Sequence, residues 1–232
     1  MSTLKVEIYS DIACPWCFVG KKRFDRALAA FAGAQDIEVV FRPYQLDPTA
    51  PEEPRPHREA LAAKYGPQSI AMDARIAELG AKEGAVFDFD HVIENNSLLA
   101  HRLLWLAERE YGSEAQCALK EQLLTGHFSE GMDIGDRAQL VDAAVAVGLD
   151  RDRATDLLDS DEGHAEVEGQ IDQARSLGIT AVPTFVFQGR YAVQGAQEAS
   201  TFLQVLEQVS AEAAASPTPT SGDVCSDGAC AI

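Results

Sequence analysis

Two cysteines three positions apart are the residues of this 232-residue sequence whose types and spacing best fit chemistry. Cys14 and Cys17 enclose Pro15 and Trp16, after an alternating apolar stretch and before a helical pattern. Two thiols at this spacing can form a disulfide, and a helix N-terminus stabilises the thiolate of the first one. We therefore expect Cys14 to attack disulfides with a pKa below the free value of about 8.5, and Cys17 to resolve the mixed disulfide.

The same pair has two other interpretations. A Cys-x-x-Cys pair is half of a tetrahedral zinc site, and Cys225 with Cys230 could complete it. A zinc knuckle usually lies on a hairpin turn, however, whereas Phe18 here continues a helical pattern. The other interpretation is two inert buried cysteines, which a helix cap disfavours. Redox chemistry is the favoured function of the pair.

A second dithiol lies near the end of the sequence. Cys225 and Cys230 follow a change to Ser, Pro, Thr, Gly and Ala at residue 214, which predicts a flexible tail. A coil of that length can reach Cys14, so we hypothesise that the tail pair relays electrons or regulates the first pair. The fifth cysteine, Cys117, lies in a helical stretch and is expected to be a small core residue.

The elements that position Cys14 form a β-α-β unit. Strands are predicted at 4–9 and 37–44, with a helix at 15–31 between them. Pro15 suits the first helical position, where its missing N–H costs nothing. Cys14 therefore lies where the first strand passes into the helix.

A long helical block and a hairpin follow. Helices are predicted at 57–65, 67–83, 97–111, 114–128, 136–147, 152–159 and 161–177. Strands at 184–187 and 191–193 and a helix at 196–213 end the folded part. The fold class is α/β: a small mixed sheet with a large helical insertion after the second strand. The expected parts are a sheet domain at 1–48 and 179–213, a helical region at 49–178 and a tail at 214–232.

Four stretches of the sequence resemble DsbA-like thioredoxin-fold proteins, specifically their FrnE-like group. They are SDIACPWCFVG at 10–20, ENNS with AHRL at 94–103, FSEGMDI at 128–134 and GITAVPTF at 178–185. The resemblance covers roughly residues 4–210. It implies a thioredoxin fold with inserted helices, and a disulfide reductase or isomerase that needs no bound cofactor.

The resemblance also implies roles for residues outside the pair. Pro183 is expected to be cis and to face Cys14, which leaves the Val182 backbone free to pair with an extended substrate. Trp16 joins them as a substrate contact. The implied substrates are protein or peptide disulfides, with an unidentified redox partner. Glutathione-dependent isomerases and transferases share this fold and are the second candidate, but they do not rely on a cysteine pair.

Charge and composition exclude other classes of function. The net charge of −18 disfavours nucleic-acid binding, which needs clustered Lys and Arg. No apolar run approaches the roughly 20 residues that span a bilayer, and the first residues lack the pattern of a secretory signal, so we expect a cytoplasmic protein. The five histidines show no metal-binding spacing.

Three polar residues are candidate auxiliary groups of the site. Asp11 could accept a proton from Cys17, although capping the turn is the favoured role. His101 shares helical spacing with apolar neighbours and is expected to be packed, and His127 is expected to line the cleft.

Overall fold

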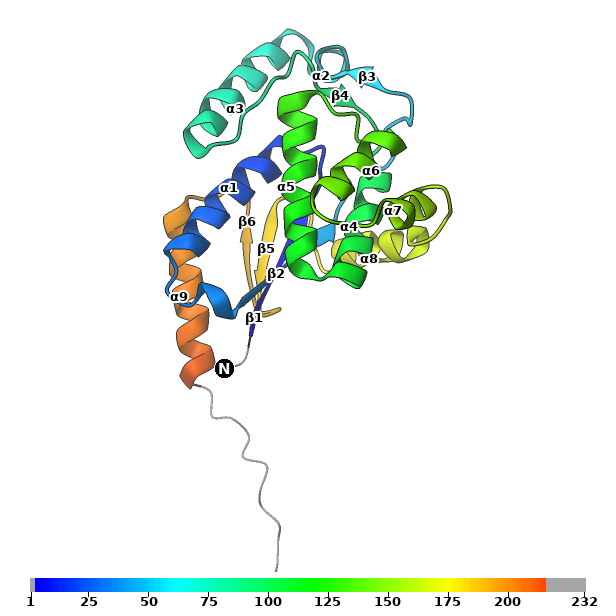
Figure 1. Ribbon diagram of the computed structural model, residues 1–232. Helices are drawn as coiled ribbons and strands as arrows, with labels where there is room; N and C mark the ends of the chain where they lie inside the picture. The colour runs from blue at the N-terminus through cyan, green and yellow to red at the C-terminus, as the bar shows by residue number, and fades with distance from the viewer. Residues whose placement is uncertain (1–2, 216–232) are drawn as a thin grey trace, which may run out of the picture.

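A four-stranded mixed sheet organises the protein, of which the computed structural model describes residues 3–215 (Figure 1). Its strands are β1 (Leu4–Ser10), β2 (Ile37–Pro43), β5 (Thr184–Phe187) and β6 (Tyr191–Gln194). Their order is β2-β1-β5-β6, with β1 parallel to β2 and the other two pairs antiparallel. The β-α-β opening and the closing hairpin predicted from the sequence are confirmed.

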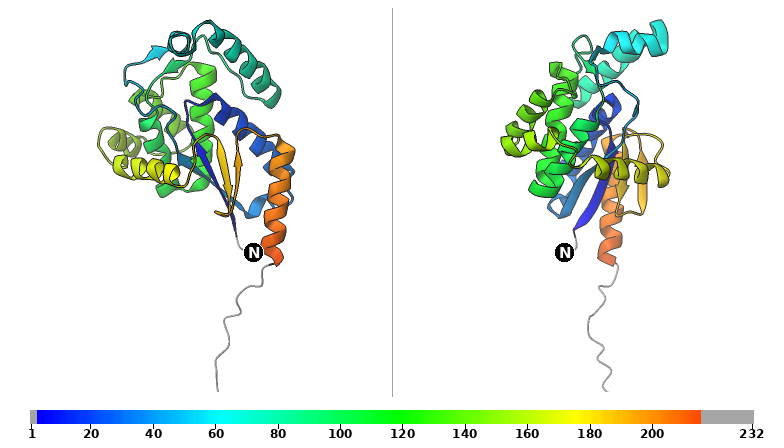
Figure 2. Two further views of the ribbon diagram at one scale, coloured as in Figure 1. Left: turned by 180° about the vertical axis from the view of Figure 1, so that it is seen from behind. Right: turned by 90° about the vertical axis from the view of Figure 1, so that its right-hand side faces the viewer.

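Two helices, α1 (Pro15–Ala30) and α9 (Ala199–Ala215), lie side by side on one face of the sheet (Figure 2). The core between them is aromatic. The ring of Phe24 from α1 lies 5.3 Å from Phe185 of β5 and 5.6 Å from Phe202 of α9, measured between centroids. These rings bury the apolar side of α1, and so they fix the end of the helix that carries the cysteines.

The inserted region between β2 and β5 is mainly helical. Its helices are α2 (His57–Tyr65), α3 (Ser69–Glu83), α4 (Leu98–Tyr111), α5 (Ser113–Glu130), α6 (Arg137–Ala146), α7 (Arg151–Leu158) and α8 (His164–Ser176). They begin and end within a few residues of the predicted segments. The insertion also contains a short antiparallel ladder, β3 (Arg55–Pro56) with β4 (Ile93–Glu94). No helix within residues 3–215 has the length and apolar character to cross a membrane.

One side-chain amide closes the β2 edge of the sheet. The backbone N–H of Phe41 donates to Gln116 Oε1 at 2.8 Å, and Gln116 Nε2 donates to the Phe41 carbonyl at 2.9 Å. The amide thus forms the two hydrogen bonds that a neighbouring strand would form. Cys117 of the same helix is partly buried and donates to the Val39 carbonyl at 3.4 Å, which agrees with a packing role. Helix α5 is therefore tied directly to the sheet.

A buried arginine holds the loop between α7 and α8 against α4. Arg102 is 3% exposed, and its guanidinium donates to three backbone carbonyls, those of Leu157, Ser160 and Glu162. These carbonyls lie at the end of α7 and in the following loop, where the helix leaves such groups without internal partners. Arg102 therefore satisfies three backbone acceptors at once, of which the Leu157 carbonyl is buried.

A buried histidine joins α2, α3 and β4. His57 Nε2 lies 3.1 Å from Asp73 Oδ1, and Nδ1 contacts Glu94. Burial alone would lower the pKa of His57, but hydrogen bonds and charge attraction from the two carboxylates outweigh it and raise that pKa. The protonated imidazole is therefore the form that the folded protein favours.

The contacts of His57 predict that its contribution to the free energy of unfolding depends on pH. Because the folded pKa is raised, the stabilisation is complete below the ordinary pKa of 6.5 and is lost as pH rises through the folded pKa. The loss of unfolding free energy in His57→Gln should therefore be larger at about pH 6 than at about pH 9. Urea unfolding at both pH values measures it. His91→Gln, which removes an exposed imidazole, is the control, and an equal His57→Gln effect at both pH values would contradict the prediction.

Candidate active site

The cysteine pair lies at the start of α1, at the end of β1 where the sequence places it. Cys14 is the N-cap residue with extended backbone angles, φ −100° and ψ 111°, and Pro15 occupies the first turn. The backbone N–H of Cys17 donates to the Cys14 carbonyl at 2.9 Å, which sets the second thiol one turn into the helix. Both residues are free thiols.

The loop before β5 faces Cys14. The Val182–Pro183 peptide bond is cis, as expected. Cys14 Sγ donates to the Val182 carbonyl oxygen at 3.8 Å. Gly20 of α1 allows this approach, because a Cβ atom there would lie 2.8 Å from Pro183 Cγ. The structure therefore brings together Cys14, Cys17, Val182 and Pro183.

The electrostatics of the two thiols differ from the expectation. Cys14 is only 3% exposed and Cys17 only 2%. Hydrogen bonding to Cys17, reinforced by burial, raises the pKa of Cys14, so the prediction of a low Cys14 pKa was wrong. Burial opposes ionisation of Cys17 too, but hydrogen bonding from Cys14 and the charge of Lys120 outweigh it and lower the pKa of Cys17. The two thiols therefore titrate as one coupled pair, in which ionisation of Cys17 is favoured over that of Cys14.

Asp11 and His101 form a buried polar group beneath the pair. Asp11 accepts hydrogen bonds from the Leu46 backbone N–H at 2.8 Å and from His101 Nε2 at 3.3 Å. His101 Nε2 also lies 3.1 Å from the Tyr44 carbonyl. Burial disfavours the Asp11 charge, yet these hydrogen bonds outweigh it and lower the pKa of Asp11, while burial lowers the pKa of His101. Asp11 therefore serves as a buried acceptor that anchors the loop at Leu46.

The other residues that the sequence predicted for the site differ in their positions. Trp16 is 42% exposed beside the pair. His127 does not line a cleft: it is fully buried against Phe128, with ring centroids 4.5 Å apart, and neither ring nitrogen has a hydrogen-bond partner within residues 3–215. Cys225 and Cys230 lie outside the described residues, and with them the tail hypothesis and the four-cysteine zinc site.

The sequence reading missed one charged residue near the pair. Lys120 of α5 is fully buried, and its charge interacts with both thiols and with Asp11. A signal was present, because Lys120 lies four positions after Gln116 and three before Leu123 on the buried side of the helix. A lysine among such positions is uncommon in a core.

Comparison with known proteins decides the family. Residues 5–207 match the model of the DSBA-like thioredoxin domain. The chain belongs to this family. Its sheet, the helix that starts at the cysteine pair and the helical insertion are accordingly the thioredoxin fold of DSBA-like proteins, as the sequence resemblance implied.

Two relatives extend over most of this DSBA-like chain. The uncharacterized protein YwbO of Bacillus subtilis is 27% identical over 204 residues, which cover 86% of this chain and 94% of YwbO. The crystal structure of the probable DsbA oxidoreductase SCO1869 from Streptomyces coelicolor is 35% identical, covers 99% of both chains and has a TM-score of 0.83.

A third structure bears on the glutathione-dependent alternative. The 2-hydroxychromene-2-carboxylate isomerase structure has a TM-score of 0.65 and covers 90% of this chain and 98% of its own. Its sequence is only 12% identical, so the likeness extends to the fold alone.

Proposed function

We propose that this DSBA-like protein is a thiol–disulfide oxidoreductase that acts on protein or peptide disulfides through Cys14 and Cys17. The observation that carries the proposal is the position of Cys14 Sγ, at the start of α1 and 3.8 Å from the carbonyl of Val182. A second thiol follows one turn later. Family membership and the similarity to SCO1869 support the same chemistry.

The exchange needs no group beyond the two thiols. Cys14 transfers its proton to the Cys17 thiolate through their hydrogen bond and attacks one sulfur of the substrate disulfide. The substrate S–S bond breaks, a mixed disulfide forms, and the other substrate sulfur leaves as a thiolate. Cys17 then transfers its proton to the thiolate that has just left and attacks Cys14 Sγ, which releases the second substrate sulfur as a thiolate. The substrate gains two electrons, and an external dithiol reduces the pair again.

The surroundings of the pair favour an extended peptide as substrate. The carbonyl of Val182 can accept a hydrogen bond from a peptide N–H once Cys14 has reacted. Trp16 and Leu46 are large apolar residues at 42% and 51% exposure; Trp16 lies between the two cysteines, and the backbone N–H of Leu46 donates to Asp11. Apolar contacts beside one strand-like backbone contact suit many different sequences, so we expect broad specificity for unfolded chains.

The test is reduction of insulin disulfides with dithiothreitol as the electron donor. The protein should accelerate precipitation of the insulin B chain, and protein alkylated with iodoacetamide after reduction should not. A rate equal to that of dithiothreitol alone would refute the proposal. Glutathione-dependent isomerisation by the alkylated protein would then favour the second enzyme class.

A further inference from the structure

Lys120 places an unpaired positive charge inside the protein. Its side chain is fully buried, and Nζ has no hydrogen-bond partner among the residues that the structure describes. Its contact with an aromatic face is long, 5.6 Å from Nζ to the centroid of Phe41. Buried lysines are normally paired, because an isolated ammonium loses its hydration without compensation. We therefore expect the ammonium of Lys120 to interact with a negatively charged group to which it forms no direct hydrogen bond in this structure.

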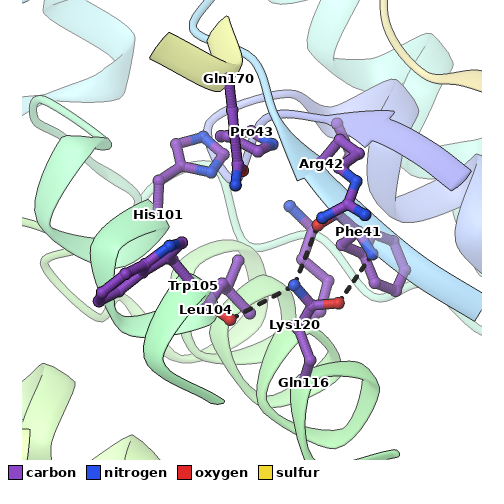
Figure 3. Close-up of a pocket in the computed structure, with 10 residues that line it drawn as sticks. Phe41, Arg42, Pro43, His101, Leu104, Trp105, Gln116, Lys120 and Gln170 are labelled. Carbon is purple, nitrogen blue, oxygen red and sulfur yellow. Dashed lines mark hydrogen bonds between the residues drawn. The ribbon is translucent and has the colours of Figure 1, made fainter. Parts of the chain in front are cut away.

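A small cavity adjoins Lys120. Its volume is about 10 Å³, about the size that admits one water molecule. Figure 3 shows His101 and Trp105 on one side of it, and Lys120 with Gln116 on the other. Ser10 also lines it, and the buried Ser10 hydroxyl helps to stabilise the Cys17 thiolate by a hydrogen bond. One water here would have polar neighbours on both sides and would serve Lys120 and Ser10 together.

The charges around Lys120 identify its partner. The titratable and charged groups that face it are Asp11, Cys14, Cys17, Lys21, His101 and Arg42. Of the three that can be negative, Asp11 already accepts hydrogen bonds from Leu46 and His101. The charge of the cysteine pair changes with its redox state, and Cys17 interacts most strongly with Lys120. Burial lowers the pKa of Lys120 to about 8, so its proton is held weakly enough to be exchanged.

Resting on the proposed exchange reaction, we propose that Lys120 is a positioning residue whose buried ammonium balances the negative charge of the reduced cysteine pair. Reduction by a dithiol breaks the Cys14–Cys17 bond and adds two electrons to the pair. The donor becomes a disulfide and gives up two protons, one to Cys14 Sγ and one to Lys120 Nζ. The thiolate of the pair and the ammonium of Lys120 then balance each other's charge. Oxidation of the pair by a substrate disulfide reverses each step, and the two thiolates formed from the substrate take up the protons of Cys14 and Lys120.

The variant Lys120→Met tests this role by removing the charge and keeping an unbranched chain. Thiolate absorbance should titrate at higher pH in Lys120→Met, because the thiolate loses its counter-charge. The equilibrium constant for reduction of the pair by glutathione should fall about fivefold near pH 7, and this difference should narrow as pH rises past 8, where Lys120 loses its proton. Lys120→Arg should restore most of the wild-type behaviour. Lys22→Met, which removes a partly exposed lysine paired with Glu121, should leave both measurements unchanged.

Two results would overturn the proposal. One is a thiolate titration and a glutathione equilibrium in Lys120→Met that match wild type across this pH range. The other comes from wild type alone and does not depend on whether the variant folds: the Lys120 Nζ signal, followed by ¹⁵N NMR, should titrate at higher pH in the reduced protein than in the oxidised one. Equal pKa values in the two states would refute the coupling. Neither readout requires turnover, so inactivity toward insulin refutes the proposed function separately.

Discussion

Replacement of Cys14 by serine is expected to lower the rate of insulin reduction by on the order of a thousandfold, to the rate of dithiothreitol alone. A serine hydroxyl cannot form the mixed disulfide through which the electrons pass. Cys14 is also the thiol that faces the Val182 carbonyl, so Cys17 cannot substitute for it without moving the start of α1. Turbidity kinetics with equal amounts of the two proteins measure the loss.

A matched series identifies the attacking sulfur. Cys17→Ser should attack once and stop, so mass spectrometry should find the peptide attached to Cys14. Cys117→Ser removes the remaining thiol of the described region, which contacts Val39 far from the exchange, and should keep full activity. The lowered pKa of Cys17 makes this thiol the alternative nucleophile. If the Cys14→Ser variant retained activity and carried the peptide on Cys17, the roles of the two cysteines would be reversed.

Replacement of Arg102 by leucine is expected to lower the free energy of unfolding by about 2–3 kcal/mol. The substitution leaves the carbonyls of Leu157, Ser160 and Glu162 without their donor and places an apolar side chain beside them. Urea unfolding followed by circular dichroism gives the value.

The control for this substitution is another arginine of the same helix. Arg109 is half exposed, contacts acidic side chains at the surface and lies over the Trp105 ring. Exposed ion pairs contribute about 0–1 kcal/mol, so Arg109→Leu should cost at most about 1 kcal/mol. Similar losses in the two variants would show that the three carbonyls find other partners when Arg102 is absent.

Much of the fold could be predicted because its signals are local. The alternation at 4–9, the proline after Cys14 and the apolar spacing of the following helix each depend on neighbours within a few residues. Glycine and aspartate residues mark the ends of several inserted helices, so the predicted helix boundaries lie close to the observed ones. Asp136 is an example, since its side chain accepts a hydrogen bond from the Gln139 N–H at the start of α6. The resemblance supplied the cis geometry of Pro183, which no local pattern shows.

The errors concern contacts between segments that are distant in the sequence. Burial of Cys14 depends on the loop at Val182, which lies 168 positions away, so helix position alone gave the wrong direction for its pKa. The interaction of Lys120 with the pair likewise needs α5 to pack on β2. A pattern of residues within one helix can show that a lysine faces the core, but it cannot show which charge meets it there.

The hydrogen bonds of Gln116 make the inserted helices part of one cooperative unit with the sheet. The backbone N–H and carbonyl of Phe41 form hydrogen bonds with this side chain. Without the helices, the sheet domain would therefore have an unpaired strand edge at β2, which could pair with other chains. The helices are in this sense not a detachable module. Loss of α5 would remove both the amide that caps the β2 edge of the sheet and the charge of Lys120 near the two thiols.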